Sequence, residues 1–211
     1  MGAEAGVVLA NYRALWDWRK RISDLYAQVR SREALLAWQH WRIVRDDLFR
    51  HHAQSPIISQ KRRQFPGVPY FSYDPSLRYL VELSEPDNIG AASLPAGRDG
   101  EVMLHPFART RGLAPLGNEL TLYWIGGYGG GVFLPFRDDT SGSETFGGGR
   151  YLLDTIKGAD LGRASDGRVI LDFNFAYNPS CAYSDQWTCP LAPRENTLPS
   201  PVRGGERSRE A

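Results

Sequence analysis

The sequence predicts an α+β fold, in which an N-terminal helical pair packs on an antiparallel β-barrel-like or sandwich sheet and a C-terminal coil crosses that sheet. Before residue 55, apolar residues recur at spacings of three and four. From residue 65, proline and glycine separate short runs rich in aromatic and β-branched residues. Helices followed by a series of strands are typical of this class. We therefore divide the chain into a helical segment (1–54), a β-rich domain with a polar site (55–200) and a flexible tail (201–211).

Two amphipathic helices are expected. The first covers residues 7–30, and its apolar positions are Leu15, Trp18, Ile22, Leu25, Tyr26 and Val29. Ser31 is the expected N-cap of the second, with Glu33 in its first turn near the positive end of the helix dipole. Leu35, Trp38, Trp41, Val44 and Leu48 form the second apolar stripe. Helical spacing alone accounts for these tryptophans, so we interpret them as packing against the sheet.

Short strands follow, separated by turns. Pro106 interrupts one of them, which predicts an edge strand or a bulge there. The glycine-rich segment GGYGGG after residue 125 predicts a hairpin and lacks the lysine and the following helix of a phosphate-binding loop. Residues 85–100 are expected to form a loop. The expected strands are 70–73, 77–83, 102–109, 119–125, 132–136, 150–156 and 168–175.

Composition excludes several classes of function. With a net charge of +1 and a pI near 7.8, the protein has no strong electrostatic attraction to nucleic acid or to an anionic membrane. Neither is therefore an expected partner. The N-terminal apolar run GVVLA is too short for a signal peptide, and no run approaches the length of a spanning helix. The expected location is the cytoplasm.

Two polar stretches are expected to form one site from two loops. They are Phe133–Asp154, FLPFRDDTSGSETFGGGRYLLD, and Asp172–Asn196, DFNFAYNPSCAYSDQWTCPLAPREN. If residues 168–175 form one strand, side chains 172 and 174 share a polar face. The candidate catalytic residues are Asp139, Glu144, Arg150 and Asp172. The candidate binding residues are Thr140, Ser141, Thr145, Tyr151, Asn174, Tyr177, Asn178, Tyr183, Glu195 and Asn196.

These residue types are compatible with more than one chemistry. Paired carboxylates can share acid and base roles when their environments separate their pKa values. Carboxylates also hold Mg²⁺ or Ca²⁺, but the spacing of an EF-hand is absent and we assign no metal ligand. Arg150 could bind an anionic group bidentately. The alternative is turn chemistry plus a buried salt bridge of Arg150 with Asp138 or Asp172.

Cys181 and Cys189 leave three interpretations open. A zinc site would need two more ligands, and no other His or Cys lies near in the sequence. A nucleophilic cysteine would need a base, for which His105 is a distant candidate. A structural or redox pair that packs the coil needs nothing else.

The two polar stretches resemble the uncharacterised prokaryotic family catalogued as domain of unknown function 1684. The segments SPI at 55–57 and FPGVPYFSYDPSLRY at 65–79 also resemble it, and the resemblance covers about residues 38–205, with the GGE that ends at Glu206. Phe146 stands where the family has tyrosine, which removes that hydroxyl. The resemblance implies that these residues act together and implies no activity.

The expected function is therefore that of an uncharacterised soluble protein with a carboxylate, hydroxyl and arginine pocket, acting as a small-molecule hydrolase. The alternative is a non-catalytic small-ligand-binding or structural module, with a flavin-binding barrel as a weaker option. The expected partner is a small-molecule ligand or substrate. The sequence specifies neither a cofactor nor the oligomeric state.

Overall fold

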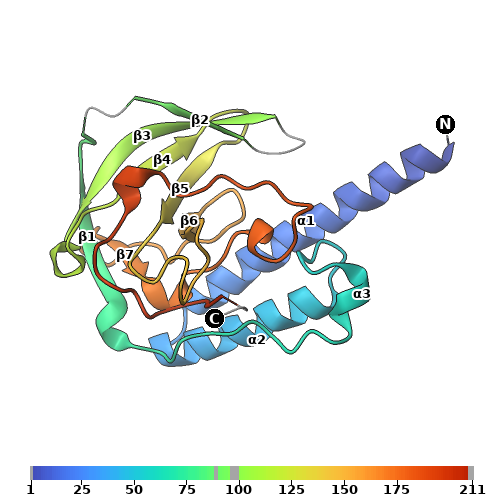
Figure 1. Cartoon of the computed structure of the whole chain (residues 1–211), viewed down its shortest axis with the longest axis horizontal. Coiled ribbons are helices and arrows are strands. Elements are labelled where there is room, and N and C mark those ends of the chain that lie inside the picture. The colour runs from blue at the N-terminus through green and yellow to red at the C-terminus, as the bar shows by residue number, and fades with distance from the viewer. Residues whose placement is uncertain (1, 88–89, 96–99, 209–211) are drawn as a thin grey trace.

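The computed structural model describes residues 2–87, 90–95 and 100–208, and shows two long helices beside a barrel-like antiparallel sheet (Figure 1). Helix α1 is Gly2–Arg30, α2 is Ala34–His51 and the short α3 is Ser59–Arg62. The described strands are β1 Arg78–Ser84, β2 Ala92–Pro95, β3 Glu101–Arg111, β4 Thr121–Ile125, β5 Gly131–Phe136, β6 Arg150–Asp154 and β7 Val169–Asp172. This confirms the α+β class. None of the described helices is long and apolar enough to cross a membrane.

The strands follow the order β6-β5-β4-β3-β1-β7, and β2 adds to β3. All of these described pairs are antiparallel. The register of β3 and β4 shifts between Pro106 and Ala108, so the proline lies at a bulge in an inner strand rather than at an edge. The predicted hairpin across Gly127–Gly130 is confirmed, since β4 and β5 pair directly on either side of it.

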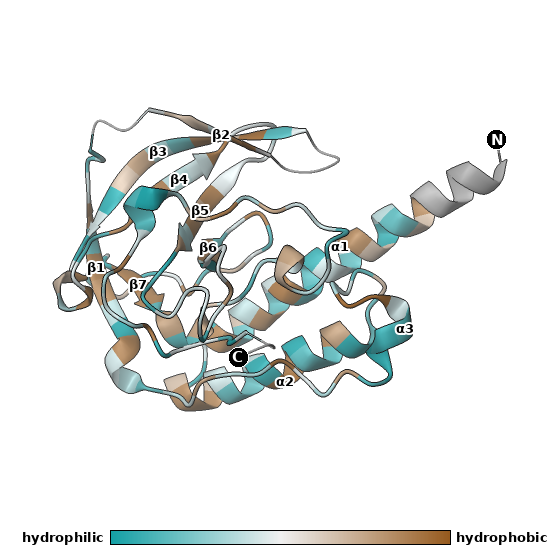
Figure 2. Ribbon diagram, viewed as in Figure 1, coloured by the Kyte–Doolittle hydropathy of each residue, from teal (hydrophilic) through white to brown (hydrophobic). Residues whose placement is uncertain are grey.

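Helices and sheet share a hydrophobic core. Trp41 of α2 is completely buried and packs edge-on against Phe175, with ring centroids 5.4 Å apart. A second core fills the barrel, with Leu134, Phe136 and Phe173 among its members. Figure 2 shows apolar and polar residues alternating around both helices. The tryptophans at 38 and 41 therefore pack against the sheet side, as their spacing predicts.

Four local predictions were wrong. The cap of α2 is Glu33, whose carboxylate accepts hydrogen bonds from the backbone N–H groups of Leu35 and Leu36. Residues 70–73 make only an isolated bridge, between Tyr70 and Glu206. The expected loop 85–100 contains β2, and part of it lies outside the described residues. The expected strand 168–175 ends at Asp172, because that side chain caps a 3-10 turn over Phe173–Phe175.

The C-terminal segment is part of the domain. Val202 and Glu206 are completely buried, and the N–H of Glu206 donates to the carbonyl of Ala176 at 2.8 Å. The N–H of Leu198 donates to the carbonyl of Arg137 at 2.9 Å, so the coil crosses the barrel as predicted. The expectation of a flexible tail from residue 201 is wrong for residues 201–208; residues 209–211 lie outside the described chain.

Candidate functional site

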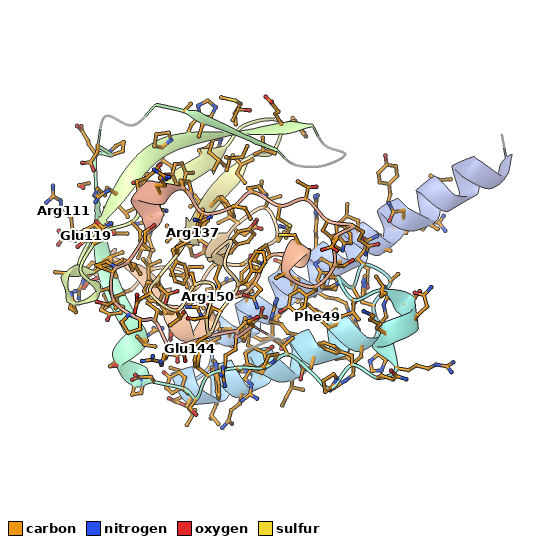
Figure 3. All side chains as sticks on the ribbon, viewed as in Figure 1. Phe49, Arg111, Glu119, Arg137, Glu144 and Arg150 are labelled. Carbon is orange, nitrogen blue, oxygen red and sulfur yellow. The ribbon has the colours of Figure 1, made fainter. Side chains whose placement is uncertain are left out.

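Arg150 lies at the centre of a buried polar network (Figure 3). Its guanidinium donates to the carbonyls of Gly204 at 2.5 Å and Val202 at 2.8 Å, and to Asp138 Oδ1 at 3.2 Å. Asp138 Oδ2 accepts from the Val202 N–H at 2.7 Å and from Thr140 Oγ1 at 2.7 Å. Burial lowers the pKa of Arg150 more than Asp138 raises it. We call Asp138, Thr140, Thr145, Arg150 and residues 202–206 the polar clamp.

A second buried ion pair completes the polar clamp. Arg45 Nη2 of α2 lies 2.5 Å from Glu206 Oε1, and both side chains are almost fully buried. Glu206 Oε2 also accepts from the Asn178 N–H and the Tyr183 hydroxyl, each at 2.7 Å. Burial alone would lower the pKa of Arg45, but the Glu206 carboxylate holds it above its usual value. This pair ties the end of the chain to α2.

The glycines before Glu206 allow the close approach. A Cβ on Gly204 would lie 2.7 Å from Leu77 Cδ1. Gly205 has φ of +75°, and a Cβ there would collide with the Ala176 carbonyl. The GGE sequence thus places the glutamate where a larger residue could not enter.

Asp172 and Asn174 lie together but point into the fold, not onto an open polar face. Asp172 Oδ1 accepts from the Asn174 N–H at 3.0 Å, and Asn174 Nδ2 donates to the Asp74 carbonyl at 2.7 Å. Both side chains are completely buried. Burial raises the pKa of Asp172, although Asn174 and Arg78, 3.6 Å away, oppose the shift. The strand that was expected to place both side chains on one face ends at Asp172, and the two residues instead meet through the turn that Asp172 caps.

The other predicted polar residues have separate partners. Asn196 Nδ2 donates to the carbonyls of Thr121 and Pro135, each at 2.8 Å, and so joins β4 to β5. Glu195 Oε1 accepts from Tyr123 at 2.6 Å. Glu144 pairs with Arg203 at 2.8 Å on the surface, and that hydrogen bond lowers the pKa of Glu144.

The remaining loop residues complete the turn that carries these groups. Thr145 Oγ1 lies 2.9 Å from Thr140 Oγ1, and Ser141 Oγ accepts from the Asp138 N–H at 3.1 Å. Asp139 is exposed. The structure thus distributes the four candidate catalytic residues over different surroundings: Arg150 in the polar clamp, Asp172 under the barrel, and Asp139 and Glu144 at the surface.

A cavity of about 400 Å³ lies between the helices, the barrel and the coil 177–190. We call it the helix–barrel cavity. Four predicted binding residues line it: Tyr151, Tyr177, Asn178 and Tyr183. From the helices come Trp18 and Phe49, of which Phe49 is labelled in Figure 3. The Tyr183 ring packs edge-on against Phe49, with centroids 5.1 Å apart.

Two buried polar atoms of lining residues have no hydrogen-bond partner among the described residues. They are Oδ1 of Asn178 and Nε1 of Trp187. Asn178 uses its other polar groups, since its Nδ2 donates to the Arg207 carbonyl at 3.0 Å. Both atoms are themselves fully buried, so they lie behind the cavity wall rather than open onto the cavity. Among residues 2–87, 90–95 and 100–208, no group of three His, Cys, Asp or Glu is arranged to hold a metal ion.

Residues 63–207 match the model of the family described as protein of unknown function (DUF1684). The chain belongs to this family. The resemblance expected from the two polar stretches is thereby confirmed. A solution NMR structure of an uncharacterised protein from Haloarcula marismortui is 31% identical, covers 80% of this chain and 91% of its own, and has a TM-score of 0.53. Among curated proteins, none matches.

Several residues that line the helix–barrel cavity of this DUF1684 protein could not be predicted from the sequence. Trp18 was expected to pack against the sheet, Trp187 lies in the expected coil, and Phe49 was not singled out, because helical spacing does not distinguish a core side chain from one that borders a cavity. Arg45 and the buried role of Glu206 were also missed. The GGE sequence was a signal for Glu206, but its partner lies 161 residues away.

Proposed function

We propose that the protein binds a small amphiphile, with an apolar body and a negatively charged head, in the helix–barrel cavity. The observation that carries the proposal is the cavity itself, which is lined mainly by aromatic and aliphatic side chains and has the exposed Arg19 at its edge. Its volume of about 400 Å³ falls in the range of small-molecule sites.

The cations beside the cavity support a negatively charged head. Arg19, Arg45 and Lys157 line it, but Arg45 is paired with Glu206 and Lys157 with Asp154, so Arg19 is the cation available to a ligand head. Arg19 and Lys157 are exposed and so lie at the solvent side. No described Asp or Glu is among the lining residues. An anionic head would accept hydrogen bonds from the guanidinium of Arg19 at the solvent side of the cavity.

Binding is favoured here over hydrolysis by the four candidate catalytic residues. Arg150 and Asp172 already have buried partners, and Glu144 is paired with Arg203 at the surface. None of the four is among the residues that line the cavity. A cytoplasmic location stays a prediction that suits the two free thiols, Cys181 and Cys189.

The test is binding of the apolar fluorophore N-phenyl-1-naphthylamine, with decanoate and decanol as competitors. Decanoate should displace the fluorophore at a lower concentration than decanol does. In Arg19→Glu the two displacing concentrations should be closer to each other. Ile156→Trp should abolish binding because the new ring occupies the cavity. Ile43→Trp, on an exposed position of α2, is the matched control. If Ile156→Trp does not fold, Leu15→Trp takes its place. Equal binding by both tryptophan variants would contradict the proposal.

A further inference from the structure

Cys181 and Cys189 lie on the coil that borders the helix–barrel cavity. Both are half-buried and free, and the two thiols lie near enough for each to shift the pKa of the other. Cys189 also lines the cavity. The next residue is held in place, because the Tyr151 hydroxyl of β6 donates to the Pro190 carbonyl at 2.5 Å. Cys189 therefore lies near a second thiol and borders a cavity at the same time.

The neighbours of the Cys189 sulfur favour its thiolate form. The Cys181 thiol and the backbone N–H groups of Cys181 and Ser180 lie near this sulfur and lower the pKa of Cys189. The Cys181 thiol has the largest of the effects that lower this pKa to about 6, and Lys157 adds to it. The same interaction raises the pKa of Cys181.

Lys157 also favours the thiolate of Cys189, whereas burial of the sulfur opposes it. Lys157, in the turn after β6, is held by Asp154 at 2.6 Å. Arg19 of α1 lines the same cavity. Burial, and then the two thiols, raise the pKa of Tyr151 well above 10, so this phenol stays neutral. A thiolate at Cys189 thus faces cations and neutral aromatic side chains, which are the surroundings of reactive rather than inert cysteines.

We propose that Cys189 and Cys181 reduce organic hydroperoxides that enter the helix–barrel cavity, with Cys189 as the attacking thiol and Cys181 as the resolving thiol. A hydroperoxide is small enough to reach a half-buried sulfur through a cavity, whereas a protein disulfide is not. The apolar lining selects an organic hydroperoxide over hydrogen peroxide. This selectivity rests on the proposed ligand cavity, while the reactivity of the thiol pair does not.

The reaction balances without a metal or cofactor. The Cys189 sulfur attacks the terminal oxygen, an S–O bond forms and the O–O bond breaks. The alkoxide takes a proton from solvent or from Lys157 and leaves as an alcohol, so Cys189 becomes a sulfenic acid. Cys181 then loses its proton and attacks the Cys189 sulfur. The S–S bond forms, the S–O bond breaks, and hydroxide leaves with that proton as water. The two thiols supply two electrons to one hydroperoxide.

Intact-mass analysis after one equivalent of cumene hydroperoxide tests the pair. The reduced wild type should lose two hydrogen atoms and keep no alkylatable thiol. Cys181→Ser should instead accumulate a sulfenic acid on Cys189 that dimedone traps. Cys189→Ser should react at least about tenfold more slowly, because the remaining thiol is mostly protonated. If the wild type forms no disulfide, or if Cys189→Ser reacts as fast, the proposal is overturned.

The pH dependence of alkylation distinguishes a reactive thiolate at Cys189 from a cysteine that only packs. This experiment uses the wild type, so it can be done even if a serine variant does not fold. Iodoacetamide should alkylate Cys189 with a midpoint near pH 6, and Lys157→Gln should raise that midpoint. A midpoint near that of an ordinary cysteine, about 8.5, would overturn the proposal.

A separate experiment tests whether the cavity selects organic hydroperoxides. Ile156→Trp should slow the reaction with cumene hydroperoxide by a larger factor than the reaction with hydrogen peroxide, because the larger molecule needs more of the cavity. Equal slowing, or none, would overturn the selectivity for organic hydroperoxides. The thiol proposal would still stand on the disulfide and the alkylation midpoint.

Discussion

The polar clamp and the helix–barrel cavity begin at neighbouring residues of β6, Arg150 and Tyr151, whose side chains point to opposite faces of the strand. In the polar clamp the buried charges are paired, Arg150 with Asp138 and Arg45 with Glu206. In the helix–barrel cavity, mainly aromatic and aliphatic side chains border a volume of about 400 Å³ that no described side chain fills. The difference indicates that the buried charges of this chain hold the fold together, whereas the unfilled apolar space is where something can bind.

Removing the C-terminal segment should have the largest effect. A chain that ends at Ser200 loses Val202, both glycines and Glu206, so Arg45 loses its carboxylate partner and Arg150 loses its carbonyl partners but keeps Asp138. We expect it not to fold, as judged by the loss of near-UV circular dichroism and of a cooperative unfolding transition. A chain that ends at Ser208 is the control and should match the full-length protein.

Arg150→Leu tests the polar clamp at one side chain. It should lower the free energy of unfolding by roughly 3–5 kcal/mol, because it leaves Asp138 as a buried charge without its partner. Urea unfolding measures this. Arg203→Leu is the matched control, since it removes an arginine from an exposed ion pair and should change stability little. Similar losses in the two variants would refute the structural role of Arg150.

Asp172→Asn should reveal a smaller, pH-dependent effect. Because burial raises the pKa of Asp172 in the folded state, its contribution to stability is fully present below the unfolded pKa of 3.8 and declines as the pH rises through the folded value. The wild type should therefore lose stability relative to Asp172→Asn between about pH 4 and pH 7. Unfolding free energies of both proteins over that range test this. An opposite slope would mean that Arg78 and Asn174 outweigh the cost of burial.

Much of the fold follows from local sequence patterns. The β4–β5 hairpin, the bulge at Pro106 and the faces of α1 and α2 are set by glycine, proline and helical spacing, which act over a few residues. The family resemblance also identified the two stretches that lie side by side, which the bridge between Tyr151 and Tyr177 joins.

The candidate site could be predicted only in part, because the role of each residue depends on partners that are distant in the sequence. Glu206 looked like part of a polar tail, since its partner Arg45 is far away in the sequence. Asp172 and Asn174 looked like an open polar face, since the turn that buries them begins with Asp172 itself. To predict a cavity, one must know which side chains leave a space unfilled, and residue spacing does not carry that information.

The central claim is that the helix–barrel cavity binds ligands and the surface carboxylates Asp139 and Glu144 do not take part. The most direct measurement is the affinity for N-phenyl-1-naphthylamine of the wild type, Asp139→Asn, Glu144→Gln and Ile156→Trp. We predict unchanged affinity for the two carboxylate variants and no binding for Ile156→Trp. Loss of binding in either carboxylate variant, with Ile156→Trp still binding, would contradict the account.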